Sequence, residues 1–243
     1  MKPVSSSAPQ QLPLPMRLRA ASVFATFCAG NNQAVLQALQ QPHPAGSPVV
    51  FLYGPTGSGK THLLQALCAQ GSTVALQVIY LPLRELHALG PEVLSGVERA
   101  ALLCIDDLQY VASDREWNRA LFALYRECEE RQARLFMASD MPPAGLPFAL
   151  PDLSSRVLAG TVLRLQLLDE SQQATALQMH AAQRGFELPD EVAQYLLRRL
   201  PRDMNRLCQF IDELDMALLA AQRRLSIPFV RNWLQGSADI PVR

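Results

Sequence analysis

Eight consecutive residues constrain the fold of this chain more than any other feature. They read Gly54-Pro55-Thr56-Gly57-Ser58-Gly59-Lys60-Thr61 and fit the pattern GxxxxGK[ST]. An apolar stretch, VVFLY, stands directly before them, and a helical stretch, HLLQALCAQ, stands directly after them. Glycines in such a loop let the backbone bend closely and aim its N–H groups at phosphate oxygens. The pattern therefore predicts a strand, a phosphate-binding loop and a helix in succession.

Two side chains at the end of this loop have predicted roles. Lys60 should reach the β- and γ-phosphates of a nucleotide, and the hydroxyl of Thr61 should ligate Mg²⁺. The helix that follows adds the partial positive charge of its N-terminus. The chain has 22 basic residues, of which Lys2 and Lys60 are the only lysines. Away from the N-terminus, the chain therefore has a lysine, with its compact ammonium group, only at the position where the motif requires one.

An acidic pair follows a second apolar stretch. Ala101–Ile105 leads directly into Asp106 and Asp107. Ligands of α/β folds bind at the carboxyl ends of parallel strands, so both carboxylates are expected near the phosphate loop. Asp106 is predicted to help hold Mg²⁺, and Asp107 to orient or activate an attacking water. The plainer alternative is two solvated aspartates that open a loop.

Further polar residues are weaker candidates on their own. The stretch Leu135–Ser139 is followed directly by Asp140. Polar residues at the end of such a strand are typical of a sensor of the γ-phosphate or, alternatively, of a capping turn. Arg156 lies before the last expected strand, and Arg202 opens an expected helix. A solvated surface position is the alternative interpretation for either arginine.

The rest of the chain divides by composition. Residues 1–22 are rich in Ser, Pro and Gln and are expected to form a disordered tail. Over residues 23–168, β-prone stretches alternate with helical ones, which predicts a parallel sheet covered on both faces. Residues 169–235 read only as amphipathic helices and predict a small helical domain, with a C-terminal tail over 236–243. The expected strands are Val49–Tyr53, Val74–Leu81, Ala101–Ile105, Leu135–Ser139 and Thr161–Leu167.

Overall composition excludes some classes of function. The 22 basic residues balance the 22 acidic ones, which argues against a mainly electrostatic binder of nucleic acid or membrane surfaces. No apolar run approaches the ~18 residues that a membrane helix needs. The N-terminus lacks the pattern of a secretory signal, and the five cysteines are scattered singly. The sequence therefore predicts a cytoplasmic protein.

These motifs, in this order, resemble those of the AAA+ ATPases of the DnaA family. The segments LLCIDDLQY, MASDMPP and SSRVLAGTVLRLQLLD are similar to that family's Walker B, sensor and arginine-finger segments. The segment from Phe24 to Asn32 resembles the stretch that lies near the adenine. The resemblance implies a P-loop AAA+ three-layer parallel-sheet core followed by a small all-α lid. It implies that Arg156 is an arginine finger, Arg202 a second sensor, and Asp140 or Ser139 a first sensor.

Within this family the chain is most similar to the Hda type, which lacks the DNA-binding domain, because it ends at Arg243 just past the expected lid. The tail then gains a predicted role. Its segment QLPLPM is similar to the peptides that dock bacterial proteins on the replication sliding clamp, although Pro13 departs from the common pattern. The residues expected to contact the clamp are Gln11, Leu12, Leu14, Pro15 and Met16.

The resemblance implies a negative regulator of replication initiation. Such a protein would bind ADP or ATP with Mg²⁺, dock on the sliding clamp (the β subunit of DNA polymerase III) and stimulate ATP hydrolysis by DnaA through Arg156. Sequence-specific DNA binding and membrane association are not expected, and self-association stays open. Two alternatives also stay open. One is a stand-alone ATPase such as a helicase loader or a transposition helper, and the other is a nucleotide-gated scaffold without a hydrolytic role.

Overall fold

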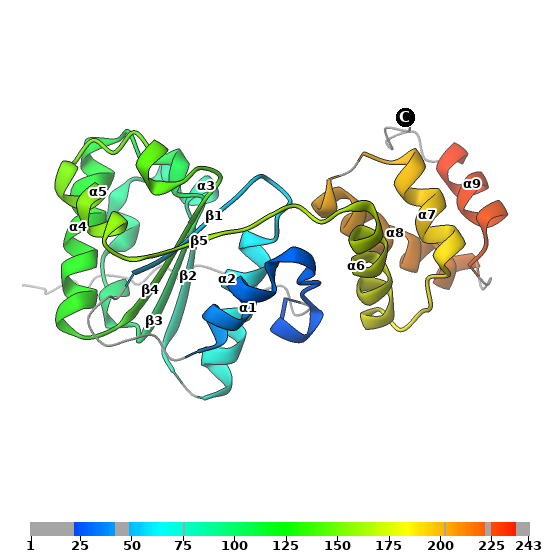
Figure 1. Ribbon diagram of the computed structural model, residues 1–243, viewed down its shortest axis with the longest axis horizontal. Helices are drawn as coiled ribbons and strands as arrows, with labels where there is room; N and C mark the ends of the chain where they lie inside the picture. Colours follow the sequence, from blue (N-terminus) through cyan, green and yellow to red (C-terminus); the bar gives the residue numbers. More distant parts are fainter. Residues whose placement is uncertain (1–21, 42–48, 75, 202, 222–224, 237–243) are drawn as a thin grey trace, which may run out of the picture.

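The computed structural model describes residues 22–41, 49–74, 76–201, 203–221 and 225–236. An α/β part and a helical part are joined by an extended segment (Figure 1). The strands are β1 (Val49–Tyr53), β2 (Val78–Pro82), β3 (Leu102–Asp106), β4 (Arg134–Ser139) and β5 (Thr161–Arg164). The α-helices of the first part are α1 (Gln33–Gln40), α2 (Lys60–Thr73), α3 (Leu83–Leu86), α4 (Arg115–Glu130) and α5 (Pro151–Leu158).

The five strands form one parallel sheet in the order β2-β3-β4-β1-β5. The strand β1, which leads into the phosphate loop, therefore lies between β4 and β5. The strand β3, which leads into the acidic pair, lies on the other side of β4 from β1. Because all strands run the same way, the segments that follow β1, β3 and β4 emerge at one edge of the sheet. This topology brings the predicted polar residues to a common site.

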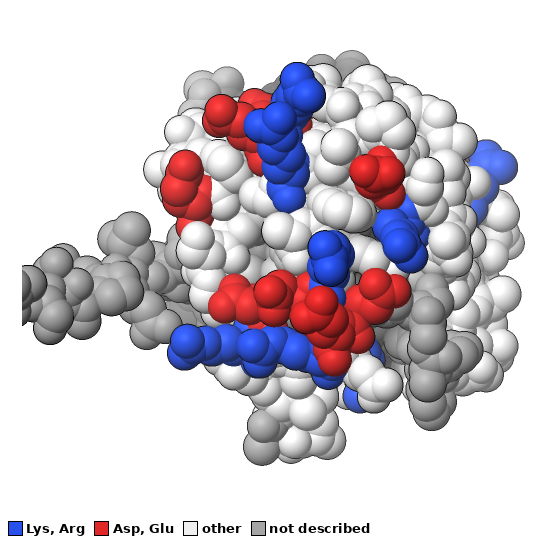
Figure 2. Space-filling view, turned by 90° about the vertical axis from the view of Figure 1, so that its left-hand side faces the viewer, with Lys and Arg blue, Asp and Glu red and all other residues white. Residues whose placement is uncertain are grey.

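Helices cover both faces of the sheet. The helices α4 and α5 lie on one face, and α1 and α2 on the other (Figure 1). The outward side of α4 and α5 carries acidic and basic side chains close together (Figure 2). Two of the ion pairs there span one turn of α4, Arg126 with Glu130 at 3.8 Å and Arg131 with Glu127 at 3.7 Å. These exposed pairs keep the outer surface of this layer solvated.

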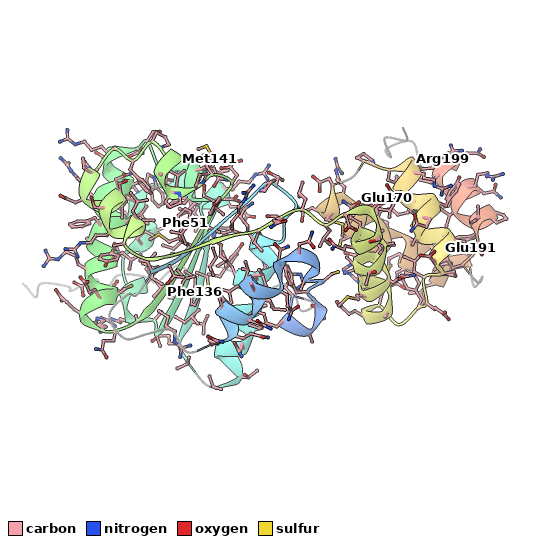
Figure 3. The ribbon with its side chains drawn as sticks, in the orientation of Figure 1. Phe51, Phe136, Met141, Glu170, Glu191 and Arg199 are labelled. Carbon is pink, nitrogen blue, oxygen red and sulfur yellow. The ribbon has the colours of Figure 1, made fainter. Side chains whose placement is uncertain are left out.

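Alternate residues of the central strands point to opposite faces and build two apolar clusters. Phe51 of β1 packs toward α4 and α5, whereas Phe136 of β4 packs toward α1 and α2 (Figure 3). Both side chains are almost fully buried. The continuous apolar strands arise because both faces are covered. The predicted three-layer core with a parallel sheet is confirmed.

Two expected strand boundaries differ from the structure by more than one residue. The second strand begins at Val78 rather than at Val74, because α2 continues to Thr73 and Val74 forms its C-cap. The last strand ends at Arg164. The backbone N–H of Leu165 still donates to the Tyr53 carbonyl at 2.7 Å, and the chain then continues toward the helical part. Several short 3₁₀ turns were also not expected from the sequence: η1 (Phe24–Thr26), η2 (Gly30–Asn32), η3 (His87–Leu89), η4 (Pro91–Leu94), η5 (Val97–Arg99), η6 (Leu108–Tyr110) and η7 (Pro143–Gly145).

The helical part has its own apolar centre. Its helices are α6 (Glu170–Gln183), α7 (Asp190–Arg199), α8 (Met204–Ala221) and α9 (Ile227–Gly236). They enclose a cluster of buried side chains that includes Leu177, Ile211, Leu214 and Val230. Asp169 caps the first of these helices by accepting a hydrogen bond from the backbone N–H of Gln172 at 2.9 Å. Over the described ranges, no helix is both long and apolar enough to cross a membrane.

Candidate functional site

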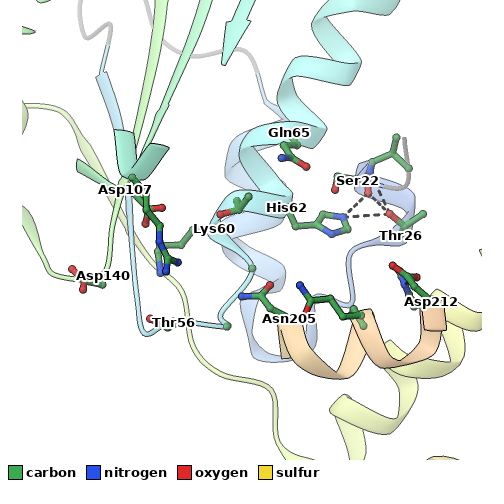
Figure 4. A pocket seen from close by; sticks show the side chains of 18 of the residues that line it. Ser22, Thr26, Thr56, Lys60, His62, Gln65, Asp107, Asp140, Asn205 and Asp212 are labelled. Atoms are coloured by element: carbon green, nitrogen blue, oxygen red, sulfur yellow. Dashed lines mark hydrogen bonds and ion pairs between the residues drawn. The ribbon is translucent and has the colours of Figure 1, made fainter. Parts of the chain in front are cut away.

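A pocket of about 1070 Å³ lies where the α/β part and the helical part meet (Figure 4). Its walls come from segments that are far apart in the sequence. These are the N-terminal segment, the phosphate loop with the start of α2, the helix α3, the segments that follow β3 and β4, and the C-terminal end of α6 together with α8. Labelled lining residues include Ser22, Thr26, Thr56, Lys60, His62, Gln65, Asp107, Asp140, Asn205 and Asp212.

The phosphate loop has the backbone geometry that its glycines predict. Gly57 and Gly59 have φ angles of 83° and 94°, in the left-handed region that favours glycine. A Cβ atom at Gly59 would stand 2.6 Å from the Phe27 ring, so the loop and the N-terminal segment are packed too closely for a side chain there. The backbone N–H of Leu63 donates to the carbonyl of Gly59 at 3.0 Å, which begins α2. The loop therefore leads directly into a helix N-terminus, as an anion site requires.

Lys60 lies inside this loop rather than in solvent. Its ammonium group donates to the carbonyl oxygens of Gly54 at 2.6 Å and Pro55 at 3.1 Å. Burial lowers the pKa of Lys60, while the nearby carboxylates, Asp106 first among them, raise it. The hydroxyl of Ser58 is buried without a protein hydrogen-bond partner among the described side chains. A donor loop with an ammonium group and an unpartnered hydroxyl fits a phosphate group.

Asp106 is the most deeply buried carboxylate of the site, with 1% of its surface exposed. Its Oδ2 accepts a hydrogen bond from the Thr61 hydroxyl at 2.6 Å and another from the Tyr80 hydroxyl at 2.9 Å. Its Oδ1 accepts the backbone N–H of Asp107 at 2.9 Å. Burial raises the pKa of Asp106, and the hydrogen bonds from Thr61, Tyr80 and the Asp107 amide oppose that effect. The structure thus joins the two predicted metal ligands, Thr61 and Asp106.

Asp107 adopts a backbone conformation that is uncommon for its residue type. Its φ of 60° lies in the left-handed region, and its carboxylate lines the pocket. The side-chain amide of Gln109 donates to Asp107 Oδ1 at 2.9 Å. Strained conformations of this kind persist where the surroundings hold them, often at functional sites. Asp107 is therefore held at the mouth of the site, next to the buried Asp106.

The two candidates for the first sensor have different environments. Ser139 is fully buried, and its hydroxyl accepts the backbone N–H of Met141 at 3.3 Å. The same hydroxyl donates to Asp140 Oδ1 at 3.4 Å. Asp140 is exposed and lines the pocket, whereas Ser139 does not. Asp140 is thus the residue of this pair that faces the pocket, and Ser139 shapes the turn that presents it.

Arg156 lies apart from the pocket that contains the other predicted residues. It is an exposed side chain of α5, and its guanidinium carbon is 5.9 Å from the centre of the Tyr125 ring on α4. A cation over an aromatic face is held weakly but directionally. The structure therefore does not bring Arg156 to this chain's own phosphate loop. Arg202 and the segment from Gln11 to Met16 lie outside the described residues.

Several pocket residues carry no recognisable motif and were missed by sequence reasoning. His62 follows the phosphate loop, and its Nε2 lies 3.0 Å from the carbonyl oxygen of Val23. The centres of the His62 and Phe27 rings are 5.5 Å apart. Burial lowers the pKa of His62. Asn205, in the first turn of α8, brings the helical part to the pocket beside the phosphate loop. Gln65 of α2 also lines the pocket, and Tyr80 of β2 contacts the buried Asp106. The only available signal was their spacing from the motifs, which does not specify contact.

The residues present fit a nucleotide with Mg²⁺ better than a metal bound by protein alone. Among the described residues, no group of three or more His, Cys, Asp or Glu is arranged to hold a metal ion. Mg²⁺ commonly takes one or two protein ligands and completes its octahedron with waters and phosphates. Thr61 and Asp106 provide oxygens for such a partial set, next to the loop whose amides would hold the phosphates.

Comparisons with known proteins agree with this arrangement. Residues 169–234 match the family model described as Hda, lid domain. Domain III of the replication initiation protein DnaA from Thermotoga maritima is similar over 90% of this chain and 98% of that one, with a TM-score of 0.74 and 23% identity. AMPPCP-bound DnaA from Aquifex aeolicus is similar over 83% of this chain and 67% of that one, with a TM-score of 0.65 and 24% identity. The RuvB branch migration motor of Thermotoga maritima gives a TM-score of 0.57 at 16% identity, over 77% of this chain and 61% of that one.

The α/β part and the helical part together have the P-loop fold of DnaA domain III. The helical part matches the lid domain of Hda over residues 169–234. The predicted core-plus-lid architecture is confirmed, and the lid match agrees with the predicted family.

Proposed function

We propose that the chain is an Hda-like negative regulator of DNA replication initiation. It binds an adenine nucleotide with Mg²⁺, docks on the DNA-loaded sliding clamp, and stimulates ATP hydrolysis by the initiator DnaA. The position of Arg156 carries this proposal, because the side chain is exposed on α5, outside the chain's own pocket, in a protein with an Hda-type lid. An arginine so placed is available to the nucleotide of a partner.

Nucleotide binding is the first part of the proposal. The amides of the phosphate loop and Lys60 would hold the phosphates, and Thr61 with Asp106 would hold Mg²⁺, which neutralises phosphate charge when bound. Asn205 and Asp140 line the same pocket from the helical part and from the end of β4. The similar DnaA from Aquifex aeolicus binds the ATP analogue AMPPCP, which supports an adenine nucleotide as the ligand. Nucleotide held between the two parts would set the angle between them.

Stimulation in trans is the second part. A guanidinium group is planar and permanently charged, and it donates in a fork that matches phosphoryl oxygens. Supplied to a partner's γ-phosphate, such an arginine finger accelerates hydrolysis by about 10³–10⁵-fold. Contact with Tyr125 would restrict where the Arg156 side chain points before it meets the partner. The initiator would convert its ATP to ADP and would no longer initiate replication.

Clamp docking is the third part and rests on the sequence of the tail. Gln11 would supply hydrogen bonds, while Leu12, Leu14 and Met16 would fill apolar pockets of the clamp. Pro13 and Pro15 would pre-extend the peptide and reduce the entropy lost on binding. Docking raises the local concentration of Arg156 near initiator molecules on the same DNA.

A reconstituted assay tests all three parts. It contains DNA-loaded clamp, ATP-bound DnaA, and this protein as wild type, Arg156→Ala, or a triple variant of Gln11, Leu12 and Leu14 to Ala. We expect both variants to lose stimulated hydrolysis, and Arg156→Lys to be nearly as defective because it lacks the fork. Arg126→Ala is the matched control, since it removes an exposed arginine from the adjacent helix. Stimulation that survives both Arg156→Ala and the triple variant contradicts the proposal.

A stand-alone ATPase is a second candidate, and one observation favours it. Asp107 is held by Gln109 beside the buried pair of Thr61 and Asp106, an arrangement suited to activating water in the chain's own pocket. This function predicts Mg²⁺-dependent ATP turnover by the isolated protein, lost in Lys60→Ala and unaffected by Arg156→Ala. Measuring phosphate release from the purified protein without DnaA or clamp distinguishes the two candidates.

A further inference from the structure

A tyrosine outside every recognised motif contacts the buried carboxylate of the site. Tyr80 lies in β2, directly opposite Cys104 of β3, and its hydroxyl donates to Asp106 Oδ2 at 2.9 Å. We infer that Tyr80 is a positioning residue that fixes the Asp106 carboxylate for the Mg²⁺ that accompanies the nucleotide. This inference rests on the proposed nucleotide binding and assigns a role to a residue that neither the phosphate loop nor the acidic pair contains.

The three donors on Asp106 divide unequally between its oxygens. The backbone N–H of Asp107 holds Oδ1, while the hydroxyls of Thr61 and Tyr80 share Oδ2. The Thr61 hydroxyl can keep its proton on Asp106 while its oxygen lone pair ligates a cation, so both hydroxyls restrict rotation of the carboxylate about its Cβ–Cγ bond. Thr61 would also be a metal ligand itself, so Tyr80 is the donor to Oδ2 whose role is limited to orientation. Without Tyr80, one hydrogen bond to each oxygen would remain, and Oδ2 would be held less firmly.

Gln65 acts on the tyrosine hydroxyl from α2. It stands four residues after Thr61, on the same face of the helix, and its side chain opposes the rise that burial causes in the pKa of Tyr80. The hydroxyl itself donates to Asp106 on β3. Gln65 is itself buried and lines the pocket.

Burial makes the hydrogen bond between Tyr80 and Asp106 costly to lose. Tyr80 is 9% exposed and Asp106 is 1% exposed, so water has little access to replace a lost bond. Hydrogen bonds to charged groups are stronger than those between neutral groups, and a buried acceptor left without its donor is costly. The mutual position of Tyr80 and Asp106 is set by the register of β2 and β3, in which Pro82 pairs with Asp106. The sheet thus places the hydroxyl without help from a loop.

A positioning role and a purely structural role predict different binding data. Loss of packing would weaken nucleotide binding equally with and without metal. Loss of carboxylate orientation would weaken only the part of the affinity that Mg²⁺ provides. The informative quantity is therefore the ratio of the ADP dissociation constants measured in EDTA and in millimolar Mg²⁺.

The experiment is calorimetric titration of ADP into the full-length protein as wild type, Tyr80→Phe, Gln65→Leu and Tyr195→Phe. We expect Tyr80→Phe to bind ADP in EDTA as the wild type does and to lose about tenfold of the Mg²⁺-dependent gain. Gln65→Leu should show a smaller loss in the same direction. Tyr195→Phe, which removes a hydroxyl from α7 of the helical part, should match the wild type. Titration of Mn²⁺ followed by electron paramagnetic resonance should show the same order of metal affinities.

The outcomes separate this inference from the function on which it rests. An unchanged ratio in Tyr80→Phe, or an equal fall in affinity with and without metal, overturns the positioning role alone. Wild-type protein that binds no ADP overturns the proposed nucleotide binding instead. Should Tyr80→Phe fail to fold, Gln65→Leu still decides, because Gln65 acts on the Tyr80 hydroxyl and an unchanged ratio in that variant also contradicts the positioning role.

Discussion

The α/β part and the helical part of this protein differ in what they bury. Almost all buried polar side chains of the described residues lie in the first part, many of them at the phosphate loop and at the ends of β3 and β4: Ser22, Asn32, Ser58, Lys60, Gln65, Asp106, Asn118 and Ser139. In the helical part, Gln173 is the one buried polar residue among those described. Burying polar groups is unfavourable unless they are hydrogen-bonded, so their concentration marks the place where function overrides packing.

The chain carries a natural reporter in each part. Of its two tryptophans, Trp117 lies in α4 and is 3% exposed, whereas Trp233 lies in α9 against Phe210 at 4.9 Å between ring centres. Trp233→Phe leaves fluorescence from the α/β part, and Trp117→Phe leaves fluorescence from the helical part. Unfolding of each part can therefore be followed separately, which makes the comparison testable.

The largest effect is expected from opening a cavity in the helical part. Leu214 of α8 is fully buried in that part's apolar cluster. Leu214→Ala should lower the free energy of unfolding reported by Trp233 by about 2–5 kcal/mol, because it removes apolar contacts and leaves a void. Trp117 should report a much smaller change, since the two parts have separate clusters.

Leu219→Ala is the control for this prediction, because it removes a 68% exposed leucine from the same helix. Urea unfolding curves of the single-tryptophan proteins provide the measurement. Equal shifts of both tryptophan signals in Leu214→Ala would contradict the idea of two separately stabilised parts.

The next effect concerns the buried polar groups of the α/β part. If Lys60 is retained for a ligand, Lys60→Ala should weaken ADP binding by about 10- to 100-fold, the size of a charged hydrogen bond to phosphate. The unfolding curves of both tryptophans should change little, because the ammonium group donates to just two loop carbonyls. Calorimetry of ADP binding checks the first part of this prediction. A stability loss that matches the affinity loss would show that Lys60 serves the fold.

The same contrast explains how much could be predicted from sequence. The phosphate loop and Asp106 follow strands whose pattern is unambiguous, and their chemistry requires fixed residue types at fixed spacings. Their convergence followed from the parallel sheet alone. The helical pattern of residues 169–235 likewise predicted helices, because amphipathic spacing is a local property.

The contacts that complete the site could not be predicted from the sequence. Tyr80 meets Asp106 because of the register between β2 and β3, and Gln65 meets Tyr80 because α2 packs over those strands. Asn205 reaches the pocket through the packing of α8 near Gly57. Register and packing depend on the whole core, so no local pattern indicates them. The role of Arg156 also stays a prediction, since its exposed position fits a partner that the chain does not contain.

A smaller effect is expected from the N-terminal cap of α4 in the α/β part. The Asp114 carboxylate accepts the backbone N–H groups of Glu116 at 2.8 Å and Trp117 at 3.1 Å, which caps α4. Asp114→Ala should cost about 1 kcal/mol of the stability reported by Trp117, because two backbone donors lose their acceptor. Asp114→Asn should keep most of it. If Trp233 reported the larger change, α4 could not be assigned to a separately unfolding α/β part.

The smallest effect is a pH dependence confined to the helical part. The backbone N–H of Gln172 and the hydroxyl of Ser171 hold the pKa of Asp169 below its ordinary value. A carboxyl whose pKa is lower in the folded state stabilises that state above the unfolded pKa of about 3.9, and the stabilisation is lost as the pH falls through the folded pKa. Asp169→Asn keeps the cap without the titration. Between pH 5 and the acid limit of folding, the wild type should therefore lose more of the stability reported by Trp233 than Asp169→Asn does. Equal losses of stability in the wild type and Asp169→Asn would show that Asp169 does not cause the pH dependence. If Trp117 rather than Trp233 reported the difference between the two proteins, the effect would not be confined to the helical part.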